Sequence, residues 1–508
     1  MRFPTTPVQA PRADGRSVAA LVAVTASLAL LAVALERGVH VRSALAVALL
    51  AAASASIVGL KASGYVRWSR LVAALILIIL FIPIRRYAFP GNLPFQLEPY
   101  RVFVALIVLG WIACLLVDRR TRPRRTGFEG PLLLIVAGVL GSVVTNGARV
   151  SQNASDVDKA VMFFLSYVFV LYVIVSVIRR VDDVEFLTKT VVVGGTIVAV
   201  AAIVEARTGF NVFNEIPRAF PILRPIADTA DLARVGTAKS RVFASAQHPI
   251  ALSAALMVLM PLAFYLARRY RRRRWTVCAI AMAAGCVSTV SRTGVLMFVV
   301  VVLVFFWLRP KELRRMWPAL VPALLAIHLV LPGTLGALKQ SFFPRGGLVA
   351  EQQYGSGTGS HGRLAAVGAA MPMWKREPFF GQGYGTTVSI WGTENLDDQW
   401  LGTLLTTGIV GFVGWVWLFV RVVRRFGREA KRDRTERGWL LASLAASITG
   451  FAGGMLTYDA FAFIQVTFLL FICVGIGSAL LTEQHDSLTV PSDSRPEVPR
   501  AAAIRPVS

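Results

Sequence analysis

Long apolar runs limit this chain to the structures that a lipid bilayer permits. A helix that crosses the hydrocarbon core needs about 20 mainly apolar residues, and the sequence offers about fourteen such runs. Of its 508 residues, 55% are hydrophobic and only 16% are charged, which is typical of a multi-pass membrane protein. Backbone polar groups in hydrocarbon must be hydrogen-bonded within the protein, so the spans are expected to be helices. The predicted fold class is an all-α polytopic integral membrane protein.

Basic residues predict how the spans are oriented. The net charge of +26 is carried by short clusters between apolar runs. These clusters fall on alternate connections, as the positive-inside rule requires, which places every cluster and both termini in the cytoplasm. The distribution favours contact with a bilayer and argues against a nucleic-acid partner. The clusters are Arg119–Arg125, Arg179–Arg180, Arg268–Arg274, Arg309–Arg315 and Arg421–Arg437.

The chain is expected to form one membrane domain with two long outer loops. The later loop is the longest polar interval, and loops of more than about 12–15 residues are usually functional or disordered. It contains tryptophans and a short helical pattern, so we expect it to be folded. A tight external turn at 291–294 and a basic cytoplasmic loop at 421–438 are also expected. The predicted divisions are a cytoplasmic N-terminal segment (1–17), the membrane domain (18–481), outer loops (205–248 and 336–400) and a disordered cytoplasmic tail (482–508).

Four residues of the predicted outer face are candidates for binding a pyrophosphate. Arg292 lies in the short 291–294 turn, Arg363 lies early in the large loop, and Arg241 and His248 lie in the other loop. The planar fork of an arginine suits phosphate oxygens, so several arginines on one face would form a clamp. Alternatively, Arg292 lies at the membrane interface and extends its charge to water. Arg363 and Arg241 would then be solvated loop charges.

An acidic pair and a glycine-rich stretch complete the candidates. Asp397-Asp398 precedes an apolar run, so a carboxylate there could accept a hydroxyl proton or cap the helix that follows. Both roles are compatible because there are two residues. Gly381-Gln382-Gly383-Tyr384-Gly385 follows no strand, which argues against a nucleotide-binding loop. We expect a tight loop that lets the backbone approach a ligand.

Taken together, four segments resemble the O-antigen ligase and polymerase (Wzy-like) family of bacterial membrane glycan transferases. One difference stands out, because aspartate occupies the position of the family's motif histidine. This difference favours a polymerase-type or exopolysaccharide member over a strict ligase to lipid A–core. The segments are Arg241–Pro249, Ser288–Gly294, Gly362-Arg363-Leu364 followed by Trp374, Pro378 and Gly381–Gly383, and Asp397-Asp398 nine residues before Gly408–Gly411.

The resemblance implies transfer of a glycan from undecaprenyl pyrophosphate to an acceptor sugar hydroxyl, on the outer face of the bacterial cytoplasmic membrane. Arg292 and Arg363 would hold the pyrophosphate and Asp397 would be the base, with His361 as the substitute. No cofactor or protein-held metal is expected. Expected partners are the polyprenyl-linked oligosaccharide, the bilayer, and a chain-length regulator or envelope assembly proteins. Two alternatives remain open, a transporter or flippase of a lipid-linked or anionic solute and a non-catalytic scaffold.

Overall fold

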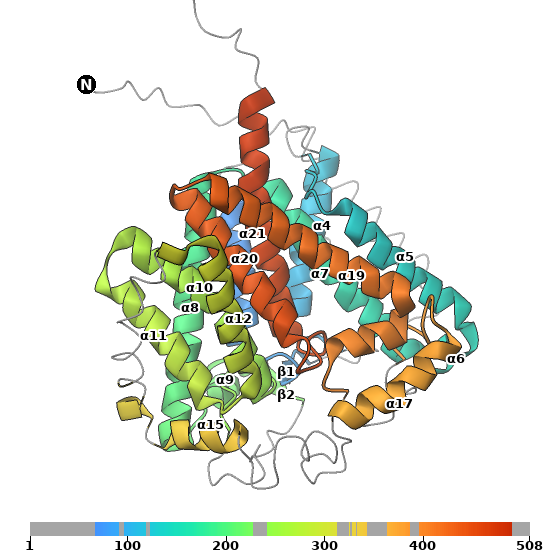
Figure 1. The fold of residues 1–508 in the computed structure, drawn as a ribbon, viewed down its shortest axis with the longest axis horizontal. Coiled ribbons are helices and arrows are strands. Elements are labelled where there is room, and N and C mark those ends of the chain that lie inside the picture. Colours follow the sequence, from blue (N-terminus) through green and yellow to red (C-terminus); the bar gives the residue numbers. More distant parts are fainter. Residues whose placement is uncertain are drawn as a thin grey trace, which may run out of the picture.

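The computed structural model describes most of the predicted membrane domain. The predicted spans before residue 67, most of the span at 317–335, His361 and the chain end after residue 489 lie outside the described residues. Helices dominate the described part, as the composition predicted (Figure 1). The structure describes residues 67–90, 96–117, 122–226, 241–311, 325, 328–331, 333–342, 363–386 and 396–489.

The helices follow the apolar runs closely, with short connections at several places. The elements are α3 (Trp68–Phe81), β1 (Tyr87–Ala88), α4 (Pro99–Val117), α5 (Glu129–Thr145), α6 (Gly147–Gln152), α7 (Ala154–Val177), α8 (Val181–Thr208), η1 (Val212–Glu215), α9 (Ile216–Ala219), β2 (Arg224–Pro225), α10 (Pro249–Tyr270), α11 (Arg273–Ser288), α12 (Arg292–Leu308), α15 (Thr334–Phe342), α17 (Arg363–Arg376), α19 (Gln399–Arg432), α20 (Glu436–Gly454) and α21 (Ile464–Thr489).

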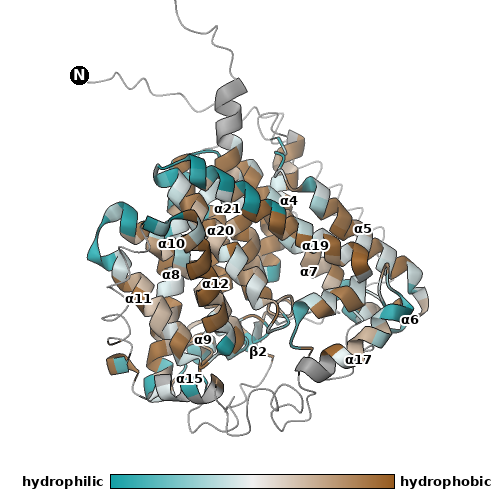
Figure 2. Cartoon of the chain, viewed as in Figure 1, coloured by the Kyte–Doolittle hydropathy of each residue, from teal (hydrophilic) through white to brown (hydrophobic). Residues whose placement is uncertain are grey.

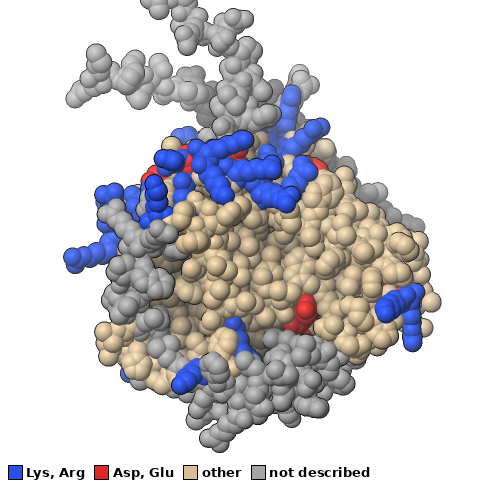
Figure 3. Space-filling view, in the orientation of Figure 1, with Lys and Arg blue, Asp and Glu red and all other residues tan. Residues whose placement is uncertain are grey.

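The described helices make this a multi-pass membrane protein. Six of them are long and apolar enough to cross a bilayer, namely α4, α7, α8, α10, α19 and α21. A broad apolar band crosses the molecule in Figure 2, and few charged side chains interrupt it in Figure 3. Lysines and arginines gather at one edge of that band, over the α10–α11 connection and the end of α19. The number of fourteen spans and the sidedness of the membrane stay predictions.

The central helices are those that are apolar on every side. In α21 the whole spanning window is buried, and in α10 83% of it is, against 44% in α4 and α7. A helix that is apolar all round belongs inside a bundle, whereas one with exposed apolar residues faces lipid. Aromatic rings hold the centre together, since Tyr167 packs edge-on against Phe468 with ring centroids 4.7 Å apart. The outer helices are therefore arranged around α10, α20 and α21.

Helix α19 is longer than the sequence analysis predicted. The basic segment expected to be a cytoplasmic loop continues as helix to Arg432, so that prediction is wrong. The reason is a buried stripe at four-residue spacing, formed by Val422, Phe426 and Ala430. Phe426 packs edge-to-face on Phe128, with ring centroids 6.1 Å apart. Burial of these side chains stabilises the helix beyond its apolar half.

Two short strands join the loops that follow α3 and α8. Strand β1 pairs with β2 in antiparallel register, with Tyr87 opposite Pro225 and Ala88 opposite Arg224. Residues far apart in sequence thus meet at the end of the bundle where α9, α15 and α17 also lie (Figure 1). These strands are a small addition to the predicted all-α fold. They fix the two loops to one another at the end that carries the candidate site.

Candidate functional site

A break in α19 connects this helix to the Gly381–Gln382 loop. Gly408 has φ 62° and ψ −163°, which interrupts the helical hydrogen bonds. The N–H of Gln382 donates to the carbonyl oxygen of Leu405 at 2.8 Å, and the N–H of Ile409 donates to that of Pro378 at 2.9 Å. Backbone groups that the break releases are therefore paired with the loop. The two glycine motifs of the sequence form one structural unit.

The end of α5 fixes the same loop from the other side. The side-chain amide of Asn146 donates to the carbonyl oxygen of Gly381 at 2.8 Å, and Arg149 donates to that of Gln382. Glycine is required at 381, because a Cβ there would lie 2.5 Å from the carbonyl oxygen of Leu405. The loop thus brings its backbone close to α19, and the expectation that it also approaches a ligand stays a prediction.

Asp398 caps the first turn of α19, as one of the two sequence interpretations predicted. Its carboxylate accepts the N–H of Leu401 at 3.1 Å. The next residue, Gln399, ties this helix start to the turn between α20 and α21. Its N–H donates to the carbonyl oxygen of Met455 at 2.8 Å, and its side-chain oxygen accepts the N–H of Phe461 at 2.7 Å. The exposed Asp397 is thereby held beside this turn.

Asp459, in the middle of the same turn, is a second acidic group at the site. Burial, and then the negative charge of Asp397, raise the pKa of Asp459 to about 6. The N–H of Ala462 and the charge of Arg85 act in the opposite direction without cancelling the increase. A carboxyl group with a pKa of about 6 exchanges its proton near neutral pH, as an acid–base catalyst must.

Arg241 lies beside the start of α12, the helix whose first residue is Arg292. Arg241 Nε donates to the carbonyl oxygen of Thr289 at 3.2 Å, in the connection that leads directly into α12. The predicted turn at 291–294 is shorter than expected, because α12 already begins at Arg292. Val290, two residues before, has φ 50°, which is a strained conformation for a β-branched residue and is commonest at functional sites.

Thr293 and Thr457 join this arginine-bearing connection to the acidic turn. Their hydroxyl groups are hydrogen-bonded at 2.9 Å. Thr293 belongs to the first turn of α12, and Thr457 lies two residues before Asp459. The structure therefore joins the segments that carry Arg241, Arg292 and Asp397, although up to 156 positions separate these residues in the sequence.

The match to known proteins covers this part of the chain. The family model described as O-antigen ligase matches residues 277–416. Residues 277–416 are therefore similar to a domain of the O-antigen ligase family, and this similarity supports, at a coarse level, an enzyme of that type. Comparison with curated proteins gave no match. The matched segment includes Arg292, Arg363, Asp397 and the Gly408 break, whereas Asp459 lies beyond its end.

His248 lies near Arg241, outside the matched segment, and it is not a cation. Its Nδ1 accepts the N–H of Ile250 at 3.2 Å and so caps α10. Its ring stacks on Phe463 with ring centroids 5.8 Å apart. Burial, and then the charge of Arg241, lower the pKa of His248 to about 4. A neutral imidazole whose Nδ1 accepts carries its hydrogen on Nε2, so it can donate one hydrogen bond to an anion but adds no charge.

The loop that carries Arg241 and His248 is held by buried polar groups that the sequence analysis missed. The carboxylate of Glu205 accepts the N–H of Ala244 at 2.8 Å. Arg86 donates to the carbonyl oxygen of Ala246 at 2.9 Å. Ala244 itself has φ 44°, which a free loop would avoid. A signal was available, since Glu205 ends an apolar run and Arg86 begins a polar one.

Arg363 begins α17, and the placement of its side chain is not described. Farther along α17, Ala370 is fully buried against Leu396 and Leu405. Leu396 immediately precedes Asp397, so α17 packs beside the acidic pair at the start of α19. His361 lies outside the described residues. The part of the chain that is described contains no group of three metal-ligating side chains, and the expected independence from metal stays a prediction.

Proposed function

We propose that the chain transfers a glycan from undecaprenyl pyrophosphate to a sugar hydroxyl on the outer face of the cytoplasmic membrane. The observation that carries this proposal is the arrangement around the α20–α21 turn. Arg241 is hydrogen-bonded beside the start of α12, and Asp397 and Asp459 interact across the turn. Cations and carboxylates at one membrane surface suit a reaction in which an anion leaves and a hydroxyl loses its proton.

In the proposed reaction the arginines bind the leaving group. Arg292 and Arg363 would hold the pyrophosphate, with Arg241 beside them and the Nε2–H of His248 as a further donor. Arg292 also lies at the N-terminus of α12, where the helix dipole favours an anion. Stabilising the charge that develops on the pyrophosphate lowers the barrier to its departure.

The acidic pair would activate the acceptor. The acceptor oxygen forms a bond to the anomeric carbon while the bond from that carbon to the pyrophosphate oxygen breaks. The pyrophosphate leaves with the bonding electrons, and the hydroxyl proton passes to Asp397. Asp459 would share that proton, because two neighbouring carboxylates bind one more readily than an isolated one. His361 remains the alternative base.

Transfer by the purified full-length chain tests the proposal. The protein receives an undecaprenyl-pyrophosphate oligosaccharide, and products are resolved by size. A ladder with the spacing of the repeat unit identifies a polymerase, whereas product only after a separate acceptor is added identifies a ligase. Intact donor moved across liposomes without transfer would contradict the proposal and support the transporter alternative.

A matched pair of arginine variants tests the proposed clamp. Arg292→Ala should lose most activity, and Arg292→Lys should recover little because a point charge lacks the bidentate fork. Arg218→Ala is the control, since Arg218 is an exposed arginine of α9, paired with Glu215 within the same short segment. Equal activity of Arg292→Ala and Arg218→Ala would refute the assignment of Arg292.

A further inference from the structure

One exposed stripe of α19 changes from apolar to basic between Val420 and Arg421. The exposed side chains before this point face the hydrocarbon of a bilayer, and those after it continue along the same face because they recur every three or four residues. The apolar members are Ile409, Val413, Val416, Trp417 and Val420. The basic members are Arg421, Arg424, Arg428, Lys431 and Arg432. The lipid-facing surface of this helix therefore leads directly into a row of cations.

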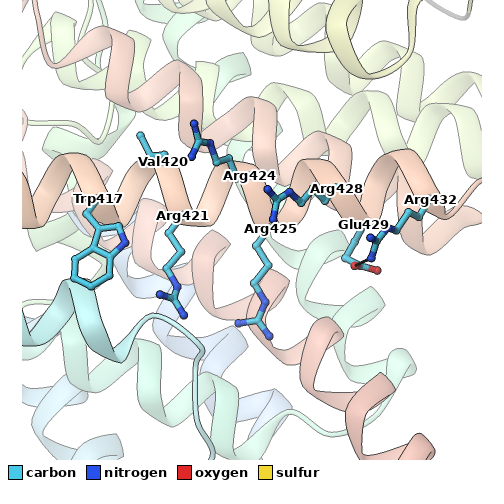
Figure 4. Close-up of a pocket in the computed structure, with 8 residues that line it drawn as sticks. All are labelled: Trp417, Val420, Arg421, Arg424, Arg425, Arg428, Glu429 and Arg432. Atoms are coloured by element: carbon cyan, nitrogen blue, oxygen red, sulfur yellow. Dashed lines mark hydrogen bonds and ion pairs between the residues drawn. The ribbon is translucent and has the colours of Figure 1, made fainter.

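The basic part of the stripe lines an open groove. Its volume is about 440 Å³, and Trp417 lies at the apolar end (Figure 4). Trp417, Arg421 and Arg425 point to one side of α19 in this view, and Arg424 points to the other. Tryptophan is enriched where hydrocarbon meets headgroups, so Trp417 marks the depth at which the arginines would meet lipid phosphates.

Within the described residues, neighbouring carboxylates act on only part of the positive charge of this groove, and Glu129 and Glu429 attract the charge of Arg425. Arg421 Nε donates to the carbonyl oxygen of Gly127 at 2.9 Å, and Arg425 donates to that of Thr126 at 3.4 Å. Glu429 is the acid in the groove, and it contacts Arg432 at 3.5 Å. Within the described ranges, the four arginines at 421, 424, 425 and 428 form no ion pair.

The local backbone is shaped to admit Arg425. Gly127 has φ 83°, and a Cβ at this position would lie 1.5 Å from a guanidinium nitrogen of Arg425. The guanidinium also lies over the ring of Phe128, 5.6 Å from its centroid. Membrane orientation requires only an excess of positive charge on one side. It does not require a glycine at 127 or an arginine held in one position at 425.

We propose that the groove binds the anionic headgroup of a bilayer phospholipid, on the membrane face opposite the candidate site. The arginine forks would contact the phosphate, and the acyl chains would lie along the apolar stripe from Val420 towards Ile409. The occupant is a membrane lipid rather than a soluble anion, because the groove is continuous with the surface of α19 that faces hydrocarbon. Bound lipid would hold the long basic half of α19 at the interface.

Lipid binding to the purified full-length protein tests this proposal. Dioleoylphosphatidylglycerol is titrated into micelles of a neutral detergent, and retained lipid is counted by native mass spectrometry. The test variant is Arg424→Gln/Arg428→Gln, because these exposed side chains make no described hydrogen bond and their loss should leave the fold intact. Arg272→Gln/Arg273→Gln removes the same charge from the exposed α10–α11 connection and is the matched control.

We expect the test variant to bind phosphatidylglycerol about tenfold or more weakly, because it lacks two basic side chains that attract anionic lipid at the membrane surface. The control should bind as the wild type does. Equal weakening in both variants, or equal retention of dioleoylphosphatidylcholine by the wild type, would overturn the proposal. Displacement of the lipid by millimolar inorganic phosphate would also overturn it, because the site would then be one for a free anion.

Discussion

The carboxylates of Asp397 and Asp459 lie close enough for the charge of one to alter the proton affinity of the other. They come from opposite sides of the bundle end, one before α19 and the other between α20 and α21. Gln399 joins the two segments through backbone and side-chain hydrogen bonds. The proton affinity of Asp459 therefore depends on the charge of Asp397.

The acidic pair predicts an acid limb in the pH–rate profile. Asp459 has a pKa of about 6 and would share the proton that Asp397 accepts, so transfer should fall as the pH is lowered through about 6. Asp459→Asn removes the neighbouring negative charge, which should shift the limb of the remaining carboxylate to lower pH. Rates measured from pH 4.5 to 8 check this. An unshifted limb in Asp459→Asn would show that the pair does not control the reaction.

A second prediction concerns Asp397 itself. Replacing it by Asn keeps the shape but removes the proton acceptor, and loss of a general base typically costs about 10²–10⁴-fold in rate. Asp398→Asn is the matched control, because asparagine is an equally good N-cap and should preserve the start of α19. Single-turnover transfer rates distinguish the two variants. A normal rate in Asp397→Asn would favour His361 as the base.

We predict that His248 contributes to stability as the cap of α10 but contributes no charge in the working pH range. Its pKa of about 4 means that it stays neutral throughout the working range and adds no step to the profile above pH 5. His248→Asn should keep α10 capped, whereas His248→Ala should lose about 0.5–2 kcal/mol of stability. Thermal unfolding of the two variants, followed by intrinsic fluorescence, measures the difference. Identical unfolding temperatures would show that the cap contributes nothing.

The sequence predicted the helices well because each helix corresponds to one continuous run of apolar residues. Apolar runs placed α10 and α12 within a few residues, and alternation of basic clusters predicted one charged end and one site-bearing end. The helical half of α19 beyond Arg421 was mistaken for a loop, because its basic residues hid the buried spacing of Val422, Phe426 and Ala430. The four-residue spacing of these three apolar positions would have predicted the helix.

The candidate site was predictable only in part, for a physical reason. Arg241, Arg292 and Asp397 were found because each stands in a short recognisable motif. Asp459 was not among the sequence candidates, because its proton affinity depends on burial and on a charge 62 positions away. Glu205 was missed for a similar reason, since its function in the fold is to hold the backbone of a distant loop. Such relationships exist only after the chain has folded.

Glu205 should control the Arg241–His248 loop without contacting substrate. Its carboxylate accepts the N–H groups of Ala244 at 2.8 Å and Phe243 at 3.4 Å. Glu205→Ala leaves these groups unpaired, at a cost of about 1–3 kcal/mol, so the loop amides should exchange faster with deuterium and KM should rise more than kcat falls. Glu215→Ala is the control, because a surface ion pair contributes about 0–1 kcal/mol. Unchanged exchange in Glu205→Ala would contradict this positioning role.

Gly408 gives the sharpest test of the break in α19. Its φ of 62° and ψ of −163° are accessible essentially to glycine alone, and a Cβ would lie 2.3 Å from the carbonyl oxygen of Phe379. Gly408→Ala should therefore cost about 1–3 kcal/mol from backbone strain and more from the clash, lowering the unfolding temperature and abolishing transfer. In the control Gly368→Ala, a Cβ on α17 would meet no atom within 4 Å, and alanine is the better helix former by about 1 kcal/mol. Its unfolding temperature should be unchanged or higher. If Gly408→Ala also unfolds at the wild-type temperature and remains active, α19 does not need the break, and the hydrogen bonds from Gln382 and Ile409 are not what fixes the outer loop.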